Sequence, residues 1–241
     1  MGESAAVGPG FQLIDQGEAP AGVACFAMVF HYYRDEGIYR DARNETALDL
    51  GGATGAAVAK DSRLWSWING GASTVTIKQL YEAAYNLNEI SGGKAHYFVK
   101  LQAETSALSD TQGRAEQLKA IIDGFLKHGR PAIVQMKPSN TLMMPTFHLV
   151  VTGYDAEARR VTYASPLDGG FTASAGVDDF IGGPFYKTGS QEQARWDGAW
   201  LGFYHGTALA GDHRFGFENA GYERAYDLHV PAAYTGQTPV P

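Results

Sequence analysis

The sequence holds a single cysteine, Cys25, among its 241 residues. One cysteine forms no internal disulfide, so the fold depends on its core, and the composition fits a reducing compartment. Clusters of lysine and arginine are also missing. The net charge is −7, and the densest basic run is Arg159-Arg160. Because contact with nucleic-acid phosphates needs clustered positive charge, we expect no nucleic-acid partner.

Long hydrophobic runs are absent too. The longest one, Val23 to Phe30, is much shorter than the roughly 20 residues that span a membrane as a helix. The first six residues lack the basic and apolar segments of a secretory signal. Ala6 stands where a myristoylation start needs Ser or Thr. We therefore expect no membrane partner, and a protein that is either cytoplasmic or secreted without a classical signal peptide.

Signatures of metal and cofactor binding are also scarce. His205, His213 and His229 lie among aromatic residues without the spacing of metal ligands, and the glycine pairs lack a phosphate-loop or dinucleotide context. We expect neither a metal nor a cofactor. The aromatic segments 65–71 and 196–204 suggest the walls of a cleft, although burial in a core is the commoner fate of such residues.

Apolar residues make up 44% of the chain, which is enough for a core, and glycines number 30. This composition favours one loop-rich α+β domain. Apolar spacing predicts helices over 21–35, 76–85 and 112–128, and strands over 96–101, 130–136, 147–154 and 160–164. Helices thus come first and antiparallel strands later. We expect one domain over residues 1–206 and an irregular extension over 207–241, packed on the domain or partly disordered.

Two segments carry a family resemblance. The first runs from Gln16 through Ala21 and Cys25 to the helix Ala-Met-Val-Phe-His-Tyr-Tyr; the second is Phe147-His148-Leu-Val-Val-Thr-Gly-Tyr-Asp, followed by Tyr-Ala-Ser165-Pro. In this order they resemble papain-like cysteine peptidases of bacteria, such as the double-glycine-leader peptidases and effector proteases, and also the phytochelatin synthases.

The resemblance implies a papain-like fold, in which an N-terminal nucleophile helix packs on a C-terminal antiparallel sheet. It also implies roles: Gln16 in an oxyanion hole, position 21 as nucleophile at a helix start, His148 as base, and position 165 as the group that orients the histidine. Substrates or partners of such a site are peptides or proteins.

The sequence departs from the family at two of these positions. Ala21 stands at the nucleophile position, and an alanine methyl group cannot attack a carbonyl carbon. Ser165 stands where Asp or Asn is expected. Cys25 lies one helical turn after the nucleophile position. Each residue also has an ordinary structural explanation, because Cys25 suits a core, His148 suits a buried or edge strand, and Gln16 suits a turn.

Three interpretations remain open. The chain is a natural pseudopeptidase that binds a peptide, or a peptidase in which Ala21 replaces the nucleophile by design, or an active thiol hydrolase that uses Cys25 with His148. A fourth alternative, from a different class, is a non-catalytic binding or adaptor module that holds a peptide tail without cutting it. The first accounts for both substitutions at once and is the one that we favour.

Overall fold

The computed structural model describes residues 3–35, 50, 57–59, 62–77, 79–80, 83, 97–102, 111–139, 146–187 and 193–205. The predicted extension over 207–241 lies outside these residues. So does half of the predicted helix over 76–85, whose start carries a capping box. The backbone N–H of Gln79 donates to Oγ1 of Thr76 at 3.2 Å, and the backbone N–H of Thr76 donates to Oε1 of Gln79 at 2.9 Å.

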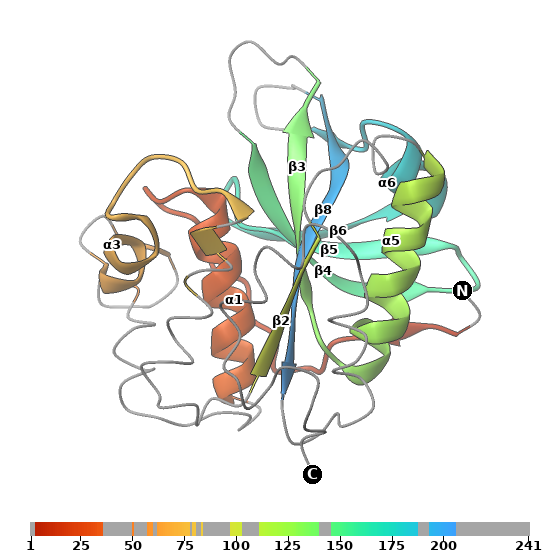
Figure 1. Cartoon of the computed structure of the whole chain (residues 1–241), viewed down its shortest axis with the longest axis horizontal. Coiled ribbons are helices and arrows are strands. Elements are labelled where there is room, and N and C mark those ends of the chain that lie inside the picture. Colours follow the sequence, from red (N-terminus) through yellow and green to blue (C-terminus); the bar gives the residue numbers. More distant parts are fainter. Residues whose placement is uncertain are drawn as a thin grey trace.

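A curled antiparallel sheet forms the centre of the molecule (Figure 1). Its strands run in the order β2-β8-β3-β4-β5-β6, while β1 pairs with β4 and β7 pairs with β8. The bounds are β1 (Ala5–Ala6), β2 (Tyr97–Gln102), β3 (Ala132–Pro138), β4 (Phe147–Asp155), β5 (Arg160–Ser165), β6 (Phe171–Gly176), β7 (Tyr186–Lys187) and β8 (Gln193–His205). With helices on its faces, the sheet gives the α+β class that the sequence predicts.

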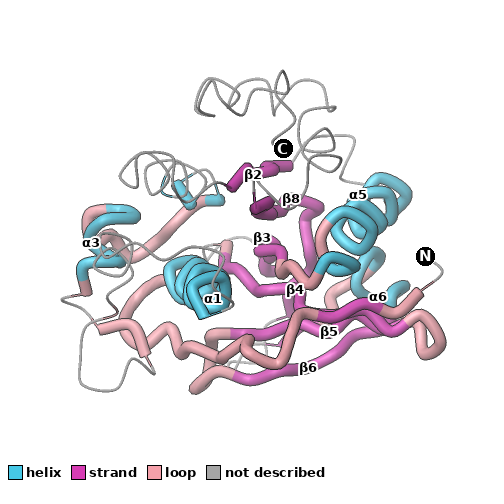
Figure 2. Tube along the Cα trace, turned by 90° about the horizontal axis from the view of Figure 1, so that it is seen from below, coloured by secondary structure: helices cyan, strands magenta, loops and turns pink. Residues whose placement is uncertain are grey.

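The helices pack on both faces of this sheet (Figure 2). Helix α1 (Ala21–Asp35) lies on one face, with α3 (Arg63–Asn69) beside it, while α5 (Thr111–Gly124) and α6 (Val177–Gly182) cover the other face. Two apolar clusters follow from this arrangement, and we call them the α1-side core and the α5-side core. The α1-side core includes Val150 and Ala164, and the α5-side core includes Val151 and Tyr163. Alternating residues of one strand therefore enter different cores.

Helix α1 is buried on all sides. Every residue from Val23 to Phe30 is inaccessible to solvent, which explains why this stretch is apolar throughout instead of showing one apolar stripe. Pro20 precedes the first helical residue, a position where its missing N–H does no harm. The predicted bounds of 21–35 are confirmed. Among the described helices, none is long and apolar enough to cross a bilayer.

The predicted strands over 96–101, 130–136, 147–154 and 160–164 are present, each within about two residues of its expected bounds. The helix predicted over 112–128 ends early, at Gly124, and a 3-10 turn (Leu126–His128) follows before Gly129, whose φ is +70°. Helices α3 and α6 and strands β1, β6, β7 and β8 are not among the predicted elements. The aromatic segment 196–204 lies within β8, where Trp196 and Trp200 are fully buried. These two side chains therefore belong to the core and do not form an open wall.

Candidate functional site

The first turn of α1 lies directly against His148 of β4. A Cβ atom built on Gly22 would lie 2.9 Å from Nδ1 of His148 and 3.3 Å from its Cε1. Glycine is therefore required at this position by close approach. The contact brings the start of the predicted nucleophile helix next to the predicted base, although the two residues are far apart in sequence.

Ala21 is the first residue of α1 and is 5% exposed. Its methyl group joins the α5-side core, which includes Phe147 and Tyr186. A hydrocarbon at this position offers neither a nucleophilic atom nor a proton for His148 to accept. The start of α1 therefore carries no nucleophilic side chain at position 21.

His148 is completely buried, and neither ring nitrogen has a hydrogen-bond partner within the described part of the chain. Burial lowers its pKa to about 4, because the charged imidazolium loses its hydration. The ring is therefore neutral near pH 7. A buried polar group without hydrogen-bond partners is uncommon in folded proteins, so a histidine at this position needs an explanation other than packing.

A polar pair that the sequence analysis missed lies beside this histidine. Gln135 of β3 is the cross-strand partner of His148, so the two side chains share the α1 face of the sheet. Gln135 donates through Nε2 to Oδ2 of Asp197 in β8 at 2.7 Å. Asp197 is buried, and its Oδ1 accepts the N–H of Ala199 at 2.9 Å. His148, Gln135 and Asp197 thus form a polar row across three neighbouring strands.

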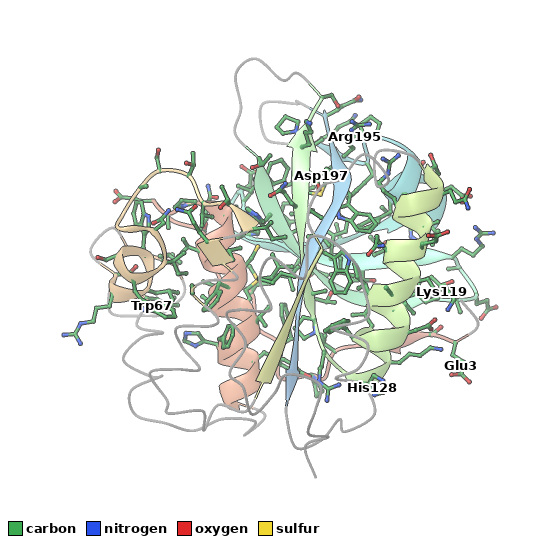
Figure 3. The ribbon with its side chains drawn as sticks, viewed as in Figure 1. Glu3, Trp67, Lys119, His128, Arg195 and Asp197 are labelled. Carbon is green, nitrogen blue, oxygen red and sulfur yellow. The ribbon has the colours of Figure 1, made fainter. Side chains whose placement is uncertain are left out.

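A β-bulge creates the space for this row. The register of β3 against β8 shifts between Val134 and Met136, and Gly198 in the bulged segment has a φ of +96°. Bulges re-aim side chains near functional sites. Figure 3 shows Asp197 near the end of β8 that lies beside the tip of β3. The one sequence signal for this row is a glutamine, Gln135, within the apolar run of β3. Its pairing with Asp197 depends on the bulge, which no local sequence pattern indicates.

Ser165 does not face His148. Val150 pairs with Ala164 in the sheet, and both belong to the α1-side core. Alternation therefore places Ser165 on the opposite face, where its Oγ shares a hydrogen bond of 2.8 Å with the hydroxyl of Tyr186. The same Oγ accepts the N–H of Leu167 at 3.2 Å. Ser165 closes the end of β5, and no contact with the imidazole accompanies these bonds.

Gln16 lies just before α1, beside the end of β5. Its backbone N–H donates to the carbonyl of Pro166 at 2.9 Å, and its own carbonyl accepts the N–H of Ala19 at 2.9 Å. The next residue, Gly17, has a φ of +56°, and a Cβ there would lie 2.3 Å from the carbonyl oxygen of Val58. The backbone around Gln16 is thus fixed at the helix start, as an oxyanion residue would need.

Cys25 lies one turn into α1 and is completely buried. Burial raises the pKa of its thiol well above the ordinary value, since the thiolate would lose its hydration. A nucleophilic cysteine needs the opposite, namely access and a lowered pKa. These properties fit a core residue and disfavour Cys25 as a partner of His148.

Within the described residues, no group of three or more His, Cys, Asp or Glu side chains could hold a metal ion. His205 ends β8, while His213 and His229 lie outside the described residues. No protein-family model matches the chain, and a search of curated proteins finds no match either. The arrangement itself offers a neutral buried imidazole, a helix start and a polar row, without a nucleophile at position 21.

Proposed function

We propose that this protein is a papain-like pseudopeptidase, which binds a peptide or protein segment at the start of α1 without cleaving it. The observation that carries the proposal is the contact between Gly22 and His148, in which the first turn of a buried helix abuts a histidine on the neighbouring strand. Papain-like catalysis needs this juxtaposition, and Ala21 removes the attacking atom from it.

The position of Ser165 favours a site that lacks more than the nucleophile over a peptidase that lacks the nucleophile alone. A base that shuttles protons needs a partner that orients its ring. Ser165 is bonded to Tyr186 on the other face of the sheet, so two of the family's functions are absent together. Gln135, which is half-buried and lies across the strand pair from His148, offers its side-chain amide to a peptide backbone.

Binding and cleavage are tested together with capped tetrapeptides of the form Ac-Ala-Ala-Xaa-Ala-NH2, where Xaa covers all side-chain classes. The chain carries ¹³C-labelled alanine methyl groups and is followed by NMR, while mass spectrometry follows the peptides. We expect some peptides to shift the signals of the Ala21 methyl and the His148 ring while all peptides stay intact. If none shifts either signal, in the native chain, in Val75→Gly or in Val75→Thr, peptide binding at this site is excluded.

Two variants separate the alternatives. Ala21→Cys tests whether alanine replaces a working nucleophile. We expect no hydrolysis, because Ser165 does not orient His148. Hydrolysis that His148→Ala abolishes would identify an inactivated peptidase instead. Cys25→Ala is the matched control. If the native chain cleaves peptides and this variant does not, Cys25 is the nucleophile and the pseudopeptidase proposal is wrong.

A further inference from the structure

The segment Ala72–Thr76, which we call the strap, runs over the start of α1. Four of its five residues are exposed, while Val75 is only 3% exposed. One buried apolar side chain on an otherwise solvated segment is the pattern of an anchor seated in a recess. The strap belongs to no described helix or strand, apart from the cap that Thr76 provides.

Val75 fills the space beside the histidine. A Cβ built on Gly22 would lie 2.4 Å from Cγ1 of Val75 and 2.9 Å from Nδ1 of His148. The valine methyl and the imidazole therefore both contact the same glycine backbone. Together with the burial of all three residues, this contact accounts for the closed state of the site.

A few side-chain hydrogen bonds hold the strap. Nδ2 of Asn69 donates to the carbonyls of Ala72 and Thr74 at 3.0 and 2.7 Å, and Nε1 of Trp65 donates to the Ala72 carbonyl at 2.9 Å. The strap is preceded by Gly70 and Gly71, which have φ values of +66° and +79° and open space on the side of a Cβ. A segment held in this way opens more easily than a helix or a sheet strand, because no ladder of backbone bonds has to break.

We propose that Val75 occupies a subsite for an aliphatic side chain of a peptide ligand, and that the strap closes this subsite until a peptide displaces it. The inference rests on the proposed function, since it names the ligand class and the regulation of the same site. A ligand that takes the place of Val75 meets the bare backbone of Gly22 and the face of a neutral ring. Such a recess suits Val or Ile. It rejects Lys, whose charge would be buried without a partner. It also rejects Asp, because a carboxylate could pair with His148 only if the buried ring took up a proton, which its lowered pKa opposes.

The test uses Val75→Gly, with Ser73→Ala as a matched control, because Ser73 lies on the exposed part of the strap. Opening is measured by the rate at which diethyl pyrocarbonate modifies His148, located by mass mapping. Binding is measured by calorimetry with the Ac-Ala-Ala-Xaa-Ala-NH2 peptides for Xaa of Val, Asp and Lys. We expect Val75→Gly to expose His148. This variant should bind the Val peptide at least about tenfold more tightly than the native chain binds it. It should also bind the Val peptide at least about tenfold more tightly than it binds the Asp or Lys peptide. The Val peptide should also protect His148.

Each other outcome is decisive. If Val75→Gly binds all three peptides equally, the aliphatic subsite is wrong while peptide binding stands. If His148 is modified no faster in Val75→Gly than in Ser73→Ala, the strap does not close the site. If the exposed site binds no peptide at all, the proposed function fails and the inference with it. Should Val75→Gly unfold, Val75→Thr keeps the shape of the side chain, and its added hydroxyl should weaken closure in the same measurements.

Discussion

The hydroxyl of Ser165 lies 2.8 Å from that of Tyr186, on the face of the sheet opposite to His148. Burial raises the pKa of Tyr186 to about 12, so its hydroxyl stays protonated at neutral pH. The pair is thus a neutral, structural hydrogen bond in the α5-side core. Ser165, to which the resemblance assigns a role in orienting the histidine, makes a structural hydrogen bond instead.

This relationship predicts a stability effect for Ser165→Ala. The change leaves the Tyr186 hydroxyl and the Leu167 N–H without their partner, which should lower the free energy of unfolding by about 1–3 kcal/mol. Urea unfolding of Ser165→Ala, Tyr186→Phe and the double variant measures the coupling. We expect the double variant to lose less stability than the sum of the single ones. Strict additivity would show that the bond contributes nothing.

Because Ser165 lies on the face of the sheet opposite to His148, we expect that Ser165→Asp does not give His148 an orienting partner. The new carboxylate should lie near Tyr186 and leave the pKa of His148 unchanged, as measured by NMR titration of the ring. Ser165→Ala, whose side chain carries no charge, is the control. A pKa of His148 that rises in the Asp variant alone would place the two side chains together and contradict this assignment.

Burial of His148 predicts a stability that depends on pH. Its folded-state pKa is about 4, below the ordinary value of about 6.5 expected in the unfolded chain. Between these values the unfolded state binds the proton and the folded state does not, so stability falls as the pH falls from 6.5 towards 4. The loss from this residue should be on the order of 2 kcal/mol by pH 5.

The measurement is urea unfolding at pH 7, 6 and 5, for the native chain and His148→Gln. Glutamine keeps a polar side chain of similar length and does not titrate, so the difference between the two slopes isolates the histidine. Parallel slopes would mean that His148 is hydrated or paired in the folded state.

The environment of Cys25 predicts a thiol that reacts only on unfolding. Iodoacetamide should modify it at least about a hundredfold more slowly in the native chain than in urea, because modification requires opening of α1. His148→Ala should not slow this reaction. A fast reaction that this variant slows would instead identify a thiolate–imidazole pair.

How far the sequence predicts this molecule depends on the range of the interactions. The bounds of α1 agree with the predicted range of 21–35, because the apolar run from Val23 to Phe30 is a signal within the segment itself. The strands of His148 and Ser165 were predicted for the same reason. Strand β8 was missed, because its aromatic residues fit a core as well as a cleft, and its place between β2 and β3 is set only by tertiary pairing.

The candidate site divides in the same way. Gln16, Ala21 and His148 were assigned to a site from spacing and resemblance, and that assignment stays a prediction. The structure brings Gly22, the residue after Ala21, against His148. The face of Ser165 could not be predicted, since pairing counted from the β4–β5 turn would place Ser165 opposite Val150. A register shift between Val151 and Gly153 pairs Val150 with Ala164 instead. The strap was equally hidden, because the burial of Val75 depends on a contact with a glycine more than fifty residues earlier.

The contact of Gly22 with both Val75 and His148 predicts the effect of adding one methyl group there. In Gly22→Ala the new Cβ would overlap Cγ1 of Val75 and approach Nδ1 of His148, so one of the two must move. We expect a loss of about 1–3 kcal/mol in the free energy of unfolding, despite the higher helix propensity of alanine.

Gly182→Ala is the matched control, because it adds the same methyl group to a helical glycine with open space around it, and it should leave stability unchanged or slightly raised. Because Val75 belongs to no described helix or strand and His148 is within the sheet, the overlap in Gly22→Ala should be relieved by displacing Val75. Adding Val75→Ala should therefore recover most of the loss. If the double variant is as unstable as the sum of its parts, the methyl group strains the sheet at His148 instead, and the strap is not the element that yields.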